Sequence, residues 1–207
     1  MFLNNIIEVF LFVNPLGPNC FETEKLIETF STERNEKVKI RFVPLLNFKS
    51  IGDMMKDQNI SSLTNRNKLY TDSYHASLAF QAASMQGKKK GRNFIMTLQH
   101  LVIEEGKEVT KELLLHIASL TKLDLEMFEE DLESELSKKA FNKDQNLAME
   151  MDITTAPSCV VYSNNDLRQG YRIDQSITKQ ILHGLCNDQV SSSTHSHLTR
   201  ISSIQTV

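Results

Sequence analysis

The feature that most constrains the fold is the stretch 6–30, in which an apolar run, a proline-containing turn and a helical pattern follow one another. Residues 6–13 are β-branched, aromatic or otherwise apolar at nearly every position, which is typical of a strand buried on both faces. Two prolines and Gly17 then interrupt this run, because proline fixes φ and glycine tolerates positive φ. After Cys20, apolar side chains share one stripe of a predicted helix, with charged residues between them: Phe21, Leu26, Ile27 and Phe30.

A strand, a tight turn and a cysteine in the first helical turn resemble the part of a thioredoxin-like protein that carries its C-x-x-C motif. The tetrad here is Gly17-Pro18-Asn19-Cys20, preceded by Pro15, so glycine replaces the first cysteine. In such motifs the first thiol attacks and the second resolves the mixed disulfide. A dithiol–disulfide cycle within this tetrad is therefore impossible. Cys20 is then either a slow monothiol or redox sensor, or a small structural residue.

Length, net charge and cysteine content limit the kinds of protein that this chain can be. The 207 residues suffice for one domain, or for one core with an inserted subdomain. A net charge of −3 gives no reason to expect nucleic acid or an anionic membrane as partner. Three widely spaced cysteines do not form a disulfide framework, and we expect neither a signal peptide nor a membrane span. These features favour a reduced cytoplasm.

A second predicted strand, 38–43, follows the first helix, so the two strands should be parallel in a right-handed βαβ unit. Residues 45–67 are expected to form a long connection with one short helix. The chain from about 72 to 151 is helical in pattern. We expect its first helix to be capped at Asp72 or Ser73. A later helix, capped by Asp124, should carry three residues on one face: Phe128, Leu132 and Leu136.

The stretch 152–161 is the second informative part of the sequence, because a polar turn there leads through Ala156-Pro157 into a predicted strand. Cis peptide bonds are nearly confined to proline, and this is the place where we expect one. Cys159, two residues on, should point to the same side as Pro157, which leaves open a redox pair with Cys20 or a core position. A hairpin strand, 168–173, and a last helix, 176–185, complete the pattern.

Two further features have competing interpretations. The basic run 88–92 is either a solvated helix start or a docking patch for an acidic partner. The Ser/Thr-rich residues 190–207 are expected to be a mobile tail, in which His195 and His197 form at best a weak metal site. His75, His100 and His116 lie in helical patterns without ligand spacing, and Cys186 has no assigned role. We expect no metal and no cofactor.

Together these elements resemble the DsbA-like branch of the thioredoxin superfamily. More narrowly, three stretches resemble the YjbH/SpxH adapters of Gram-positive bacteria: LFVNPLGPNCFETEKLI (11–27), HASLAFQAASMQGKKKGRNF (75–94) and LDLEMFEEDL (123–132). The resemblance implies an α/β, thioredoxin-like (DsbA-like) sheet with a large helical insertion. The expected division is a discontinuous thioredoxin-like domain, 1–70 and 138–189, and an insertion, 71–137.

The resemblance also implies a function. Such adapters are cytoplasmic proteins that deliver the regulator Spx to the ClpXP protease, so the expected partners are proteins. The alternative is a monothiol thiol–disulfide oxidoreductase or isomerase that uses Cys20. For binding, we favour the turn around Pro15, with Gly17, Pro18, Asn19 and Cys20 as contact residues, and Pro157 as its structural neighbour. The sheet edge and a face of the helical insertion are the alternative surfaces.

Overall fold

A computed structural model describes residues 6–162, 169–174, 176–187 and 198–202. The described strands form one five-stranded sheet in the order β2-β1-β3-β4-β5. β1 pairs in parallel with β2, and all other neighbours are antiparallel. The bounds are Ile6–Val13 (β1), Lys37–Pro44 (β2), Ser158–Tyr162 (β3), Gln169–Ile173 (β4) and Leu198–Ser202 (β5). The predicted βαβ unit and the predicted hairpin are confirmed.

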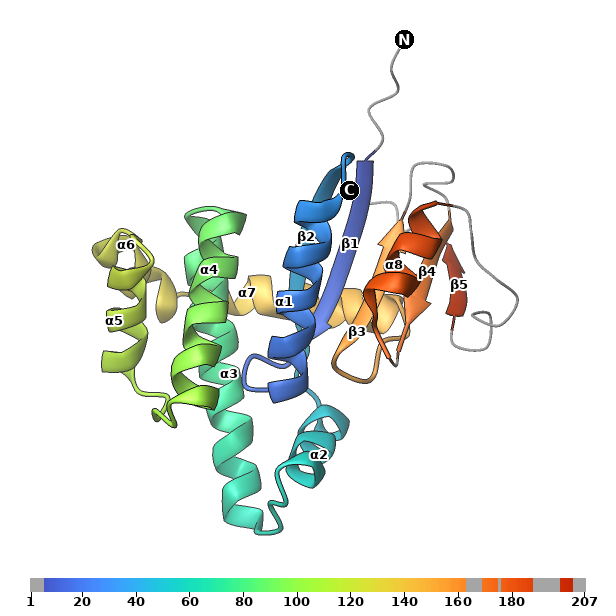
Figure 1. The fold of residues 1–207 in the computed structure, drawn as a ribbon. Coiled ribbons are helices and arrows are strands. Elements are labelled where there is room, and N and C mark those ends of the chain that lie inside the picture. The colour runs from blue at the N-terminus through green and yellow to red at the C-terminus, as the bar shows by residue number, and fades with distance from the viewer. Residues whose placement is uncertain (1–5, 163–168, 175, 188–197, 203–207) are drawn as a thin grey trace.

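Helices cover both faces of the sheet, and a group of them lies beside it (Figure 1). The helices are α1 (Pro18–Glu33), α2 (Phe48–Asp57), α3 (Leu63–Met85), α4 (Lys88–Gln99), a π-helical turn η1 (His100–Glu104), α5 (Lys111–Leu120), α6 (Leu125–Leu132), α7 (Glu135–Glu150) and α8 (Lys179–Cys186). We call residues 63–132, from α3 to α6, the helical segment. This architecture confirms the predicted DsbA-like α/β fold.

The sheet has a different core on each face. On one face, Ile27 and Phe30 of α1 and Leu182 of α8 pack against alternate residues of β1, among them Val9 and Leu11. This core continues into the helical segment. On the other face, α7 covers the sheet with a smaller cluster: Phe12, Val43, Leu147, Ala148, Met151 and Val160. Both faces of β1 are therefore buried, as its apolar sequence predicts.

Polar side chains fix where most of the helices begin. Each of these side chains accepts a hydrogen bond from a backbone N–H group in the first helical turn, which would otherwise lack a partner. The caps are Asn47 (α2), Ser62 (α3), Thr110 (α5), Asp124 (α6), Ser134 (α7) and Thr178 (α8). The predicted cap at Asp124 is confirmed.

Three predicted helix limits are wrong. α3 begins at Leu63 and not near Asp72, because Ser62 caps it and its first turns project into solvent, where no apolar stripe marks them. Leu136 does not share a face with Phe128, since α6 ends at Leu132 and Ser134 starts a new helix that leaves Leu136 exposed. The last helix begins at Lys179 instead of residue 176.

The C-terminal stretch also differs from its prediction. Residues 198–202, expected within a mobile tail, form β5 and pair with β4. Edge pairing uses backbone groups, so it needs little apolar periodicity in the added strand. Residues 163–168 of the predicted hairpin and both tail histidines lie outside the described residues. The expected domain limits at 70/71 and 137/138 fall inside α3 and α7, and the division into domains stays a prediction.

Candidate functional site

The turn between β1 and α1 encloses the thiol of Cys20. Its Sγ atom accepts a hydrogen bond from the backbone N–H of Asn14 at 3.3 Å, and the side chain is only 2% exposed. Burial is the largest influence on this thiol and raises its pKa well above the ordinary value, while the bond from Asn14 acts in the opposite direction. Cys20 is thus a protonated, enclosed thiol at neutral pH.

Asn14 holds the turn in place from within the core. Its Oδ1 atom accepts hydrogen bonds from the N–H of Leu16 at 2.9 Å and from the hydroxyl of Ser73 on α3 at 3.1 Å. The backbone N–H of Gly17 in turn donates to the carbonyl of Asn14 at 3.0 Å. The turn is therefore fixed both by its own backbone and by the helical segment.

Only part of the predicted contact turn can reach a partner. Pro15, Gly17 and Cys20 are buried, Pro18 is half-buried and Asn19 is exposed. The missing side chain at position 17 leaves no hole either, because a Cβ atom there would lie 3.3 Å from the carbonyl oxygen of Asn14 and closer still to Cys20. A partner at this face would meet Asn19 and the outer edge of Pro18.

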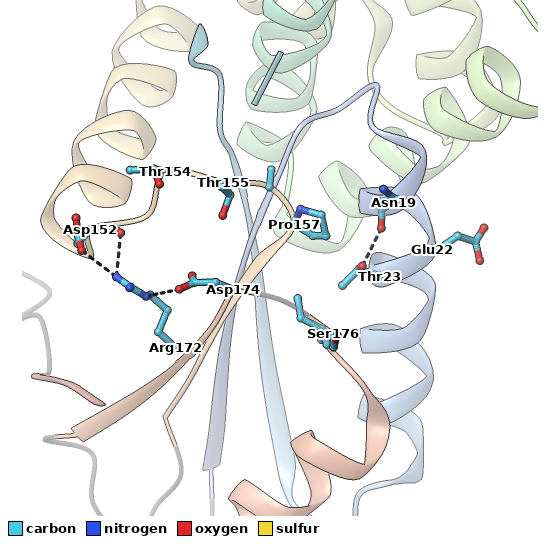
Figure 2. A pocket seen from close by; sticks show the side chains of 12 residues that line it. Asn19, Glu22, Thr23, Asp152, Thr154, Thr155, Pro157, Arg172, Asp174 and Ser176 are labelled. Carbon is cyan, nitrogen blue, oxygen red and sulfur yellow. Dashed lines mark hydrogen bonds and ion pairs between the residues drawn. The ribbon is translucent and has the colours of Figure 1, made fainter. Parts of the chain in front are cut away.

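The Ala156–Pro157 peptide bond is cis, as predicted. Pro157 faces the first turn of α1 across a groove of about 700 Å³ (Figure 2). One wall of the groove comes from α1, with Asn19, Glu22 and Thr23. The opposite wall comes from the loop before β3 and the end of β4: Asp152, Thr154, Thr155, Ala156, Pro157, Arg172 and Asp174. Segments far apart in sequence thus form one open, polar groove.

Carboxylates dominate the charge of this groove. Arg172 is held between Asp152 at 3.2 Å and Asp174 at 2.9 Å, so its charge is already neutralised (Figure 2). Glu22 adds a third, exposed carboxylate. At the edge of the groove, Asn19 donates to Asp57 of α2 at 2.9 Å. A cationic or polar segment suits these walls better than an acidic one.

The two cysteines outside the turn lie away from the groove. Cys159 is completely buried in the same core as Cys20, and burial followed by the nearby Cys186 raises its pKa. It therefore occupies a core position, one of the two alternatives that the sequence left open. Cys186 is half-buried at the end of α8.

Sequence reasoning missed two buried carboxyl groups, Glu24 and Asp144. Glu24 is one of the charged residues between the apolar positions of α1, yet it has no exposed surface and receives a hydrogen bond from Gln99 of α4 at 2.9 Å. The helical spacing offered a signal, because Glu24 stands three and six residues before Ile27 and Phe30 on the apolar stripe.

Within the described part of the chain, no group of three His, Cys, Asp or Glu residues could hold a metal ion. No described helix is both long and apolar enough to cross a bilayer. His75, His100 and His116 lie on α3, η1 and α5.

Curated relatives share one name. The chain is 27% identical to ClpXP adapter protein SpxH of Bacillus subtilis in a match that covers 88% of the chain. It is 28% identical to the protein of that name from Bacillus licheniformis in a match that covers 79% of the chain. A Staphylococcus aureus relative of the same name is 26% identical over 81% of the chain. The chain spans 69% of the length of the first relative and 59% of the other two. These matches confirm the resemblance proposed from sequence.

Solved structures agree on the fold. A putative protein disulfide isomerase from Nitrosomonas europaea superimposes with a TM-score of 0.69 at 14% identity, covering 88% of this chain and 96% of that one. BdbD from Bacillus subtilis has a TM-score of 0.60 at 18% identity, with 88% and 86% covered. A family model described as Thioredoxin matches residues 10–183. With that match over most of its length, and with a DsbA-like fold, the chain belongs to the thioredoxin family.

Proposed function

We propose that this chain is an adapter that binds a regulator resembling Spx and presents it to the ClpXP protease, with no covalent step. The names of the curated relatives support the adapter role. The observation that carries the non-covalent mechanism is the burial of Cys20 beside Gly17. An adapter raises the local concentration of its client at the protease, which requires a complementary surface and no reactive group.

The thiol environment argues against the monothiol alternative. A cysteine that attacks disulfides must be accessible and partly ionised. Cys20 is enclosed, and burial raises its pKa. The disulfide isomerase name belongs to a structural neighbour at 14% identity, a likeness that shows the fold alone. A turnover assay with insulin or a dithiol substrate tests this alternative directly, and activity that disappears in Cys20→Ser would contradict the non-covalent proposal.

The groove between α1 and the loop before β3 is our candidate for the client surface. It is open, is built from two parts of the chain and has exposed polar groups on both walls. Asn19, from the predicted contact turn, lines it. The client segment that fits it is polar or basic, since Asp152 and Asp174 outnumber Arg172. Glu22 adds an exposed carboxylate, which Lys25 binds at 3.0 Å. The proposal places this encounter in the cytoplasm.

The test is degradation of a purified Spx from the same organism by ClpXP, with and without the full chain. The chain should accelerate degradation, and Cys20→Ala should accelerate it equally. Because the chain spans only part of its relatives, binding of Spx is measured separately from degradation. If Spx neither binds nor is degraded faster, the adapter proposal is wrong.

A bulky substitution locates the surface. Thr154→Trp fills the groove from an exposed position on its wall, and should weaken Spx binding at least tenfold. Ser119→Trp, at a hydroxyl residue of the helical segment that is also exposed, is the matched control and should bind normally. The reverse result would move the client surface to the helical segment. Gly17 is unsuitable for this test, because any side chain there crowds Cys20 inside the turn.

A further inference from the structure

The adapter role makes no use of one completely buried carboxyl group. Glu24 lies on α1, one turn after Cys20, and has no exposed surface. Its neighbours on this side of the helix, Ile27 and Phe30, are enclosed core residues. An ionised carboxylate in such surroundings is very unfavourable, so a buried acid either pairs with a cation or keeps its proton.

The hydrogen bonding of Glu24 is half complete. Gln99, at the end of α4, is also fully buried, and its Nε2 atom donates to Oε1 of Glu24 at 2.9 Å. The remaining oxygens, Oε2 of Glu24 and Oε1 of Gln99, are buried and have no hydrogen-bond partner. Buried polar atoms rarely stay unsatisfied. A single proton on Oε2 would give the amide oxygen its donor and satisfy both atoms at once.

The surrounding charges favour that proton. The carboxylate of Glu28, one turn further along α1, disfavours a negative charge on Glu24. The nearby cation Arg92 of α4 binds Glu28, with 2.6 Å between its Nε atom and Oε1 of Glu28. None of the ion pairs found in the described residues includes Glu24. Cys20, on its other side, is a neutral thiol. Burial, more than Glu28, raises the pKa of Glu24 to about 8, although the bond from Gln99 lowers it.

The helix that carries Gln99 widens directly after it. In η1 the N–H of Glu105 donates to the carbonyl of His100, five residues earlier, at 3.3 Å. In a regular α-helix, residues five apart point roughly 140° away from each other. The widened turn lets Gln99 reach Glu24 while Glu104 reaches Lys25 on the same helix α1 at 2.9 Å. Such π-turns are rare and often mark functional positions.

We propose that Glu24 keeps its proton in the folded protein and forms a two-bond acid–amide pair with Gln99, which fastens the helical segment to α1. Glu24 is the donor of one bond and the acceptor of the other. Ionisation removes the donor and leaves a carboxylate facing the amide oxygen, so the contact between α1 and α4 weakens as pH rises. Glu24 is a positioning residue, and this inference does not depend on the adapter role.

The direct test follows the ¹³C signal of the Glu24 carboxyl in the wild-type full chain by NMR from pH 4 to pH 10. We expect the shift of a neutral acid up to about pH 7, and the shift of a carboxylate only at higher pH. Titration of Glu24 near pH 4.5 would overturn the proposal. This measurement needs no variant, so a failure of any mutant to fold does not affect it.

Substitutions test the pairing itself through thermal unfolding at several pH values. Glu24→Gln can form the same two bonds without a proton, so it should keep or raise the unfolding temperature above pH 7 and reduce its pH dependence. Gln99→Glu should destabilise the fold above pH 7, because two facing carboxyl groups form two hydrogen bonds only when both carry a proton. The double variant, Glu24→Gln with Gln99→Glu, places the amide on α1 and the acid on α4. It should restore most of the stability that Gln99→Glu alone loses.

Glu28→Gln is the matched control, since Glu28 is half-buried and already paired with Arg92. It should narrow the pH dependence assigned to Glu24 without abolishing it, because burial raises the pKa of Glu24 more than the charge of Glu28 does. If Glu24→Gln lowers the unfolding temperature as much as Glu24→Ala does, or if the double exchange restores nothing, the acid–amide pair does not exist.

Discussion

A Cβ atom placed on Gly17 would lie 2.9 Å from the Sγ atom of Cys20. This is too short for two unbonded atoms, but it matches the separation of about 3 Å between the Cβ of one cysteine and the sulfur of the other across an S–S bond of about 2.04 Å. The turn therefore retains the backbone arrangement of a C-x-x-C motif although one of its cysteines is absent.

Gly17→Cys should consequently form a disulfide with Cys20 under mild oxidation. Mass spectrometry of the alkylated protein, with and without reductant, measures it. Gly52→Cys is the matched control, because a Cβ atom at that position of α2 meets nothing within 4 Å. A Gly17→Cys protein that keeps both thiols reduced in oxidant would show that the turn has a different geometry.

The three native cysteines should react with iodoacetamide in a definite order. Cys186, which is half-buried, should be alkylated in the folded protein, whereas Cys20 and Cys159 should react only on unfolding. Both lack access, and burial raises the pKa of both thiols, which depletes the reactive thiolate. Peptide mapping after timed alkylation, in buffer and in denaturant, gives the rates. Fast labelling of Cys20 in buffer would show an accessible thiol and would favour the alternative function, a monothiol enzyme.

Stability should fall as pH rises from about 4.5 to about 8. The pKa of Glu24 in the folded chain is raised above its ordinary value of 4.5, so the folded state binds one more proton within this window. Within this window the free energy of unfolding falls by about 1.4 kcal/mol per pH unit. The contribution of Glu24 to stability is fully present below the window and is lost at its upper end. Asp144, whose pKa burial also raises, acts in the same direction.

Denaturant titrations of wild type and Glu24→Gln at each pH isolate the part due to Glu24, because Asp144 contributes to both proteins and cancels in the difference. Parallel curves for the two proteins would contradict the assignment.

Arg41 should matter more for stability than other charged residues of its strand. Its guanidinium donates to the buried carboxylate of Asp144 at 2.7 Å, and Gln81 of α3 donates to the other oxygen, so this carboxylate joins β2, α3 and α7. Arg41→Met leaves Asp144 buried with one partner fewer, and should cost about 1–3 kcal/mol.

Lys39→Met provides the comparison. It breaks an exposed pair with Glu8 on the same sheet, and should cost at most about 1 kcal/mol. Urea unfolding at pH 7 measures both variants. Equal losses would mean that the carboxylate of Asp144 is not held as the structure places it.

The elements that the sequence predicted well are those whose signals are local. The apolar run 6–13 predicted β1, the proline-containing turn predicted the start of α1, and the proline after Ala156 marked the cis bond. The start of α3 and the pairing of β5 escaped prediction. An exposed helical turn and an edge strand are held by backbone hydrogen bonds, which leave little pattern in the side chains.

The sequence by itself also determined that this turn cannot run a dithiol cycle, because a glycine at position 17 has no sulfur whatever the fold. Only the tertiary structure decided the state of the remaining groups. It enclosed Cys20, and it joined the first turn of α1 to residues 152–157 as one groove. It also set Gln99 against Glu24 across 75 residues of sequence. Burial and hydrogen-bond partners come from segments far apart in the chain, and they decide whether an ionisable side chain is charged, reactive or merely structural.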